Sequence, residues 1–170
     1  MSSMLSASSA DTATNQLVID ASVAMKWFLD DEVDTDLAEA ILAQSLGGSL
    51  ELHAPELFRY EVDGALARAC LTRFERGGQP RLALPDALDA LTTLNASPIQ
   101  YHHLALADRG SALSMAVDYS KGYYDMVYLN LAERLNCQWC TADSRILTPT
   151  RGGFPSHHIV ILSSLRMEAS

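Results

Sequence analysis

The sequence predicts an α/β fold in which a parallel sheet is covered by helices on both faces. Short apolar runs that contain β-branched residues alternate along the chain with longer segments in which apolar residues recur every three or four positions. Strands that alternate with helices favour a parallel sheet, because each connection between parallel strands crosses one face of that sheet. A length of 170 residues, 48% of them hydrophobic, suits one domain with a sizeable core.

Five segments have the pattern of short, buried strands. The first, QLVID, is a brief apolar run, and the second, LELHAP, stops at Pro55. The expected strands lie at residues 16–20, 50–55, 98–103, 137–143 and 157–162.

The segments between these strands have helical periodicity and recognisable ends. Ser22 is placed to cap a first helix that runs to Phe28, and a pair of glycines ends the second helix. Pro85 takes a favourable first position in the fourth helix, and Gly110 allows an interruption of the fifth. The expected helices lie at residues 22–28, 34–46, 56–74, 85–94, 103–120 and 123–136.

The first residues differ in composition from the rest of the chain. Residues 1–16 are rich in Ser, Ala and Thr and lack an apolar pattern, so we expect a disordered tail followed by a single domain at residues 17–165. The tail has neither the basic and apolar regions of a secretory signal nor the Arg of a mitochondrial presequence. No apolar run approaches the roughly 18 residues of a membrane span.

The chain has three cysteines, Cys70, Cys137 and Cys140. Their odd number and loose spacing do not suit a disulfide framework and favour a reducing cytoplasm. The segment CQWC matches the C-x-x-C motif, but on a strand its two thiols would point to opposite faces, and no second pair completes a zinc site. We therefore expect buried side chains here rather than zinc or redox chemistry.

The net charge of −9, taken alone, argues against nucleic-acid binding, because affinity for phosphates comes mainly from Lys and Arg. Two features weaken this objection. A divalent cation bound by carboxylates reverses the local field. Residues 68–81 also hold four Arg and one Glu, which suits either a solvated helix end and loop or a surface that contacts RNA or an acidic partner.

Two acidic residues come at the ends of expected strands. Asp20 closes the first strand, and Asp143 closes the fourth. Ligands of parallel α/β sheets bind outside the carboxyl ends of the strands, so both side chains are placed where a binding site is expected.

Two further acidic residues interrupt the apolar faces of helices. Glu61 lies four residues from Leu57 and four from Ala65, so it points roughly toward the core. Asp125 lies near a helix start, three residues before Tyr128 on the face expected to be buried. Both carboxylates are therefore expected to point inward.

Four inward carboxylates need a partner that relieves their repulsion. Two of them at ~4 Å repel by about 4 kcal/mol at an effective dielectric constant near 20. Such groups either take up protons or bind a hard cation, for which Mg²⁺ or Mn²⁺ is suitable. Separate explanations stay open: Asp125 can favour the helix dipole, Glu61 can pair with Arg59 or Arg68, and Asp143 can cap the SRIL turn.

The segments that contain these four residues, in order, are VIDASVAMKWFLDDE, APELFRYEVDGALARA, YYDMVYLNLAERL and TADSRIL. They resemble the motifs of PIN-domain ribonucleases, most of all the VapC-type toxins of bacterial and archaeal toxin–antitoxin pairs. The resemblance extends from Leu17 to Leu162. It implies a three-layer α/β/α sandwich, cleavage of RNA that depends on Mg²⁺ or Mn²⁺, a homodimer, and inhibition by a small VapB-like antitoxin whose tail occupies the active-site groove.

The resemblance also implies roles for individual residues. Asp20 and Asp143 would bind the ion directly, with Asp125 and Glu61 completing or water-bridging the site. The small hydroxyl residues of the family match Ser22 and Thr141, which would hold water or a carboxylate. The chain departs from the family at Gly64, where Asn is frequent, and this change can loosen a hydrogen bond or a substrate contact.

Other residues are candidates for contacts with RNA. The side chain of Trp27 suits either stacking on a base or packing in the core. The candidate contacts to backbone phosphates are Lys26, Arg59, Lys121 and Arg145.

Three other functions compete with this one. A haloacid-dehalogenase-like phosphatase also begins with an Asp after its first strand, but it needs a second Asp where this chain has Ser22. A metal-free ribonuclease would use His102, His103, His157 or His158 as acid and base, although adjacent histidines on a strand point to different sides. A non-catalytic PIN-like module would bind RNA or assemble without cleavage, but a binder of polyanions would gain from losing the four acids.

Overall fold

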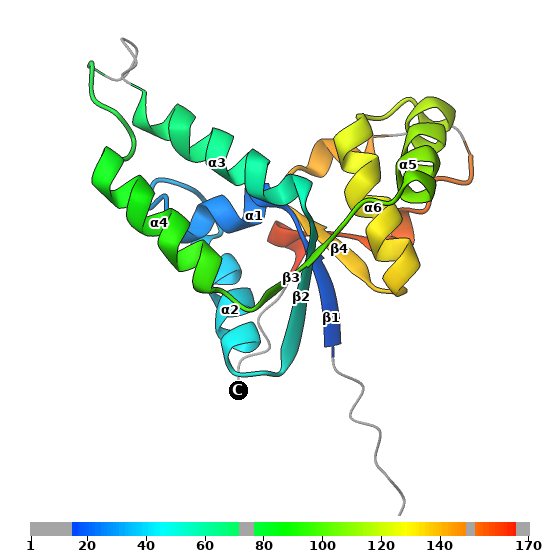
Figure 1. Ribbon diagram of the computed structural model, residues 1–170, viewed down its shortest axis with the longest axis horizontal. Helices are drawn as coiled ribbons and strands as arrows, with labels where there is room; N and C mark the ends of the chain where they lie inside the picture. The colour runs from blue at the N-terminus through cyan, green and yellow to red at the C-terminus, as the bar shows by residue number, and fades with distance from the viewer. Residues whose placement is uncertain (1–14, 72–76, 149–151, 166–170) are drawn as a thin grey trace, which may run out of the picture.

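The computed structural model describes residues 15–71, 77–148 and 152–165. Its centre is a five-stranded sheet in the order β3-β2-β1-β4-β5, in which every neighbouring pair is parallel (Figure 1). The predicted α/β fold with a central parallel sheet is thus confirmed. The strands are β1 (Asn15–Ile19), β2 (Leu50–Pro55), β3 (Ile99–His102), β4 (Gln138–Thr141) and β5 (Ile159–Ile161).

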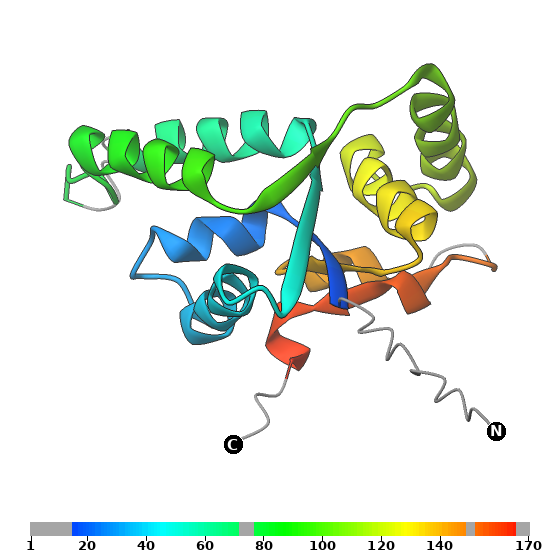
Figure 2. The same cartoon turned by 60° about the horizontal axis from the view of Figure 1, so that its bottom comes forward.

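Helices cover both faces of this sheet. Helices α1 to α4 lie on one face and α5 and α6 on the other, so the molecule has three layers (Figures 1 and 2). The helices are α1 (Ala21–Ala24), α2 (Thr35–Leu46), α3 (Leu57–Cys70), α4 (Leu84–Ala96), α5 (Leu106–Tyr119) and α6 (Tyr123–Leu135). Short 3₁₀ helices are η1 (Met25–Trp27), η3 (Ser144–Leu147), η4 (Ser156–His158) and η5 (Leu162–Ser164).

Strand β1 lies at the point where the strand order reverses. Val18 has His53 of β2 as its partner on one side and Trp139 of β4 on the other. From β1 the chain adds β2 and then β3 on one side of the sheet. It then crosses to the other side of β1, where it adds β4 and β5. In α/β sheets this reversal leaves a crevice at the carboxyl ends of the two central strands, here β1 and β4.

The core on both sides of β1 fixes these strand ends in place. The rings of Tyr128 on α6 and Trp139 on β4 stack at 5.7 Å with an interplanar angle of 12°, and both side chains are buried. Trp27 donates its indole N–H to the carbonyl oxygen of Ala38 at 2.8 Å. The packing interpretation of Trp27 therefore holds.

Several predicted boundaries were wrong. Ser22 does not cap α1, because Asp20 takes that position, and its carboxylate accepts the Ser22 amide hydrogen at 2.7 Å. Helix α5 continues through Gly110 without interruption. His157 and His158 were expected in the last strand but lie in η4, just before β5.

The predicted end of the third helix and the predicted start of the first strand also need correction. Helix α3 ends at Cys70, and residues 72–74 of the predicted helix lie outside the described residues. Strand β1 begins at Asn15, one residue before the predicted strand start at Gln16, so it takes in the last two residues of the predicted tail, and residues 1–14 of that tail lie outside the described residues. Within the described ranges, every helix is too short or too polar to span a bilayer.

All three cysteines carry free thiols. Burial raises the pKa of Cys137, and burial together with the Asp20 carboxylate raises the pKa of Cys140 to about 12. A protonated thiol is a weak nucleophile, so both cysteines of the C-x-x-C segment react slowly at neutral pH.

Candidate active site

A pocket of about 440 Å³ opens at the carboxyl ends of β1 and β4. All six residues that the sequence predicts as site residues line it, although they come from well-separated parts of the chain. They are Asp20, Ser22, Glu61, Asp125, Thr141 and Asp143. We call this space the acidic pocket.

Asp20 is held at the end of β1 by its backbone and by its side chain. Its amide donates to the Cys140 carbonyl oxygen at 3.0 Å, which extends the pairing of β1 with β4. Its carboxylate oxygen Oδ1 accepts the Ser22 amide hydrogen at 2.7 Å. Burial raises the pKa of Asp20, although hydrogen bonds from Ser22 and Thr141 oppose this shift.

The two hydroxyl residues tie the ends of β1 and β4 together. Ser22 Oγ accepts the Ala142 amide hydrogen at 3.0 Å, and Thr141 Oγ1 accepts the Asp143 amide hydrogen at 3.2 Å. The two hydroxyl oxygens lie 3.5 Å apart. Ser22 and Thr141 therefore hold the backbone next to Asp20 and Asp143.

Glu61 reaches the acidic pocket from α3 and accepts a hydrogen bond from the Tyr128 hydroxyl. Burial is the main cause that raises the pKa of Glu61, and the Asp20 and Asp125 carboxylates add to it. Burial next to Asp20 and Glu61 also raises the pKa of Tyr128, which keeps that hydroxyl protonated as a donor.

Asp125 lies in the first turn of α6 and folds back over the helix start. Burial raises its pKa, and the Asp20 and Asp143 carboxylates raise it further. A Cβ atom at Gly122 would lie only 2.8 Å from Asp125 Oδ2. A side chain at position 122 would thus displace the carboxylate from this position.

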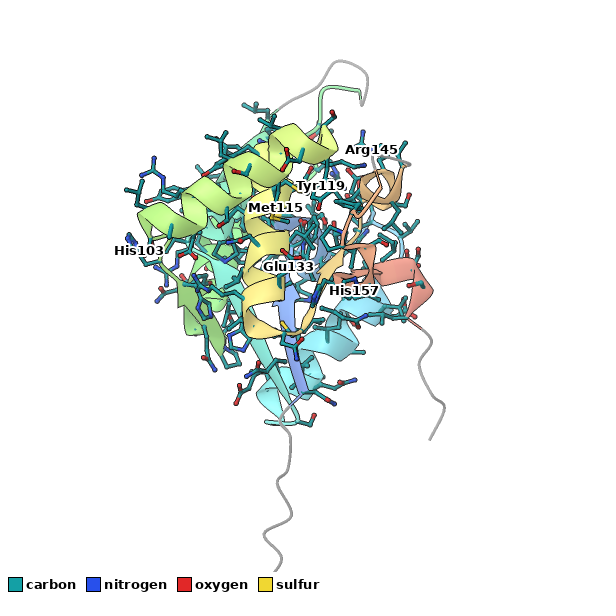
Figure 3. All side chains as sticks on the ribbon, turned by 90° about the vertical axis from the view of Figure 1, so that its right-hand side faces the viewer. His103, Met115, Tyr119, Glu133, Arg145 and His157 are labelled. Atoms are coloured by element: carbon teal, nitrogen blue, oxygen red, sulfur yellow. The ribbon has the colours of Figure 1, made fainter. Side chains whose placement is uncertain are left out.

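Asp143 differs from the other three acids because it has a cationic partner. Arg145 donates to it from Nε at 2.8 Å and from Nη2 at 2.6 Å, and the Asp143 carboxylate caps the η3 turn by accepting the Arg145 amide hydrogen at 2.9 Å. These hydrogen bonds lower the pKa of Asp143. The Arg145 side chain is 87% exposed and lies at the surface (Figure 3).

The predicted cationic contacts divide into two groups. Lys121 and Arg145 line the acidic pocket, whereas Lys26 and Arg59 do not. The Lys26 side chain is 6% exposed and forms an ion pair with Glu32 at 3.4 Å. Arg59 lies over the ring of Tyr101, 3.9 Å from its centroid. The structure thus does not support Lys26 and Arg59 as phosphate contacts at this pocket.

The histidines lie outside the acidic pocket. His102 faces His53 across a ring nitrogen distance of 3.0 Å, and His158 donates to the Cys137 carbonyl oxygen at 2.7 Å. Figure 3 shows His103 and His157 on opposite sides of the molecule. The two pairs of adjacent histidines therefore do not form one acid–base site.

The carboxylates fit a hard divalent cation by their donor chemistry. Oxygen atoms are the ligands that such ions prefer, and a cation would offset the burial that raises the pKa of Asp20, Glu61 and Asp125 and the repulsion that adds to it for the last two. As the side chains stand, no three His, Cys, Asp or Glu residues of the described ranges converge closely enough to chelate one ion. Ion binding therefore requires side-chain rotation, most clearly of Asp143 away from Arg145.

Sequence reasoning missed Tyr128 as a residue of the site and assigned it only to the core. It is buried, yet its hydroxyl reaches Glu61 at the floor of the pocket. A signal was present, because Tyr128 follows Asp125 by three residues and shares its helix face.

Comparisons with known proteins agree with this architecture. The family model described as the PIN domain matches residues 17–149. No curated protein is significantly similar to the chain in sequence.

Three solved structures with a similar fold are 11–16% identical to the chain. PAE2754 from Pyrobaculum aerophilum is 16% identical, with a TM-score of 0.58 over 89% of this chain and 93% of that one. VapC20 of Mycobacterium tuberculosis, a sarcin–ricin loop cleaving toxin, is 11% identical, with a TM-score of 0.55 over 72% and 85%. A toxin–antitoxin complex from Klebsiella pneumoniae is 12% identical, with a TM-score of 0.54 over 86% and 97%. At these identities the likeness shows the fold.

Proposed function

Because the chain belongs to the PIN domain family, we propose that it is an endoribonuclease that depends on a divalent metal ion and acts as the toxin of a VapBC-type pair. The observation that carries the proposal is the acidic pocket, where carboxylates from β1, α3, α6 and β4 meet at the switch point of the sheet. Three of these carboxylates have raised pKa values, which is typical of sites arranged for chemistry rather than for stability.

Asp20 and Asp143 would bind Mg²⁺ or Mn²⁺ directly, with Asp125 and Glu61 completing the site. When bound, such an ion supplies Lewis-acid polarisation of the scissile phosphate and lowers the pKa of the attacking water. Hydrolysis would leave a 5′-phosphate and a 3′-hydroxyl. The family resemblance and the oxygen-rich donor set support this assignment.

The chain's own residues hold the site and free it for the substrate. Ser22 and Thr141 keep the two strand ends together, and Tyr128 holds one oxygen of Glu61. Arg145 has to leave Asp143 before that carboxylate can bind an ion. An ion pair this exposed is strongly screened by water, so an RNA phosphate can take over the Arg145 guanidinium at little cost.

The proposed partners are RNA, a small VapB-like antitoxin and a second copy of this chain. The toxin–antitoxin complex from Klebsiella pneumoniae shares the fold over 86% of this chain, which supports an antitoxin partner. We propose the cytoplasm as the place of action, because the three free thiols suit a reducing compartment.

The proposal is tested by cleavage of cellular RNA by the purified protein, followed by sequencing of the RNA ends. We expect Asp20→Asn to reduce cleavage at least about 100-fold, because it removes one charged ligand and little volume. EDTA should stop cleavage by the wild type, and Mn²⁺ should restore it. The matched control is Asp89→Asn, an exposed acid on α4 that should cleave like the wild type.

Unchanged cleavage by Asp20→Asn would contradict the proposal. Full activity in EDTA would instead favour metal-free chemistry by histidine. RNA binding without any cleavage would favour the non-catalytic PIN-like module.

A further inference from the structure

A second pocket adjoins the acidic pocket and shares Ser22 with it. This side pocket has a volume of about 270 Å³ and lies between the segment that follows β1 and the second half of α3. Its walls are both apolar, from Met25 and Leu29, and charged, from Arg68, Arg81 and Glu32, the last two of which pair with each other. A polymer bound across the acidic pocket can therefore continue past Ser22 into a space that offers both kinds of contact.

Arg68 lies where the two pockets meet. It follows Glu61 by seven residues on α3, which is about two helical turns and places both side chains on one face. Its guanidinium folds back over Gly64, because a Cβ atom built at that glycine would lie 3.4 Å from Arg68 Nη1. The charge of Arg68 also lowers the pKa of Glu61, so the guanidinium is close to the acidic pocket.

Gly64 leaves open space beside this guanidinium, which a Cβ atom at that position would just touch. Side chains of α-helices lean toward the helix N-terminus, so Arg68 extends over the turn that contains position 64. A longer side chain there would occupy the space of the guanidinium. The family frequently has Asn at this position. In this chain the position is Gly64, and the Arg68 guanidinium covers that turn of the helix.

Within the described residues, Arg68 is also the cation at these pockets that forms neither an ion pair nor a side-chain hydrogen bond. Arg145 pairs with Asp143, Arg81 pairs with Asp31 and Glu32, and Lys121 donates to the Thr148 carbonyl oxygen at 3.1 Å. Arg68 has no ion pair and no side-chain hydrogen bond within residues 15–71, 77–148 and 152–165. Its five N–H donors are therefore available to an anion from outside the chain.

We propose that Arg68 binds a backbone phosphate of the RNA strand next to the scissile one, and that the side pocket holds the attached nucleotide. The inference rests on the proposed nuclease function of the acidic pocket. The guanidinium suits bidentate contact with a phosphate, and the apolar wall at Met25 and Leu29 suits a ribose or base. RNA is favoured over an acidic peptide, because Ser22 lines both pockets and the acidic pocket is the proposed site of RNA cleavage.

The test measures binding of a fluorescently labelled single-stranded RNA of mixed sequence by anisotropy, in Mg²⁺ and at several salt concentrations. All proteins carry Asp20→Asn, so that the strand stays intact. Adding Arg68→Gln should weaken binding about fivefold and lower the salt slope by about 0.7, the value for one contact with a single strand. The matched control is Arg109→Gln, an exposed arginine on α5 that lines neither pocket and should change neither quantity.

A second variant tests whether RNA binding depends on the position of the Arg68 guanidinium as well as on its charge. Gly64→Asn should displace the guanidinium and weaken binding by a similar factor, and Arg68→Gln should then add little, because both changes remove the same contact. Arg68→Lys should keep the salt slope. Melting curves of each variant establish that the fold is intact.

Equal affinities and salt slopes for Arg68→Gln and Arg109→Gln would overturn the inference and leave the nuclease proposal untouched. The absence of RNA binding by the parent, or weakened binding of a poly(glutamate) peptide with unchanged RNA binding, would overturn it as well. If the wild type binds RNA through Arg68 but does not cleave it, the contact stands and the nuclease proposal fails.

Discussion

Two groups of acidic residues lie on either side of the side pocket, and they are neutralised in different ways. In the acidic pocket, Asp20, Glu61 and Asp125 have raised pKa values, because they are buried close to one another. In the second group, which we call the ion-pair cluster, Glu32 lies 2.6 Å from Arg81 and 3.4 Å from Lys26, and these cations lower its pKa.

The ion-pair cluster has an evident structural task. Arg81 also pairs with Asp31, so it ties the segment before α4 to the segment after η1. An acid that serves stability is paired with a cation of the same chain. Three acids of the acidic pocket have no such pair among the described residues, and this difference supports the proposal that a cation from outside the chain binds them.

The largest expected effect that sharpens this contrast is stabilisation by Mn²⁺. An ion that binds only the folded state at 100 times its dissociation constant adds about 2.7 kcal/mol, which corresponds to roughly 5–10 °C in melting temperature for a chain of this size. We expect this shift in the wild type and its loss in Asp20→Asn and Asp125→Asn. Differential scanning fluorimetry with and without Mn²⁺ measures it.

The ion-pair cluster supplies the control for the Mn²⁺ experiment. Glu32→Gln also removes one carboxylate, but from a residue that is already paired with Arg81 and Lys26. Its Mn²⁺ shift should equal that of the wild type. If Glu32→Gln loses the shift and Asp125→Asn keeps it, the two groups have been assigned the wrong way round.

The sheet and the acidic pocket were predictable because they depend on patterns that are local in sequence. The apolar run before Asp20 and the helical spacing around Glu61 each require only a few neighbouring residues. In a parallel sheet, residues that end neighbouring strands lie together, so the convergence of Asp20 and Asp143 follows from the strand assignments. All six predicted residues line one pocket for this reason.

The remaining features depend on distant pairing or on competition between two caps. Arg81 meets Asp31 across 50 residues, and no periodicity reports such a contact. Ser22 and Asp20 are both good capping residues, and Asp20 takes the position because its carboxylate accepts the Ser22 amide hydrogen. The Tyr128 hydroxyl reaches Glu61 only because α3 and α6 approach the same strand ends.

An intermediate effect is expected in the pH dependence of stability without metal. An acid whose pKa is raised by folding holds its proton more tightly in the folded state, so the free energy of unfolding falls as pH rises above the ordinary carboxyl value near 4. We expect Asp125→Asn to be more stable than the wild type near pH 7.5, and by less near pH 4.5, because burial and neighbouring carboxylates raise the pKa of Asp125. Urea unfolding in EDTA measures this difference.

The comparison of Asp125→Asn with the wild type cancels the contributions of the other titrating groups to the pH dependence. His53 and His102 have pKa values lowered by burial, so their protonation destabilises the folded state as pH falls. That contribution has the opposite sign but is the same in the wild type and in Asp125→Asn. A stability difference that does not grow with pH would show that folding does not raise the pKa of Asp125.

The smallest expected effect concerns the ion-pair cluster itself. Arg81→Gln should lower the free energy of unfolding by about 1 kcal/mol, because partly exposed ion pairs contribute little each, even in a network. The Arg81, Glu32 and Asp31 side chains are 24%, 32% and 52% exposed, so water screens their attraction. The melting temperature should fall by roughly 2–4 °C, and Arg109→Gln, the exposed arginine on α5, should leave it unchanged.

The Mn²⁺ shift should survive Arg81→Gln in full. Loss of that shift would mean that the ion-pair cluster also positions the carboxylates of the acidic pocket, and the two groups would then act as one electrostatic unit.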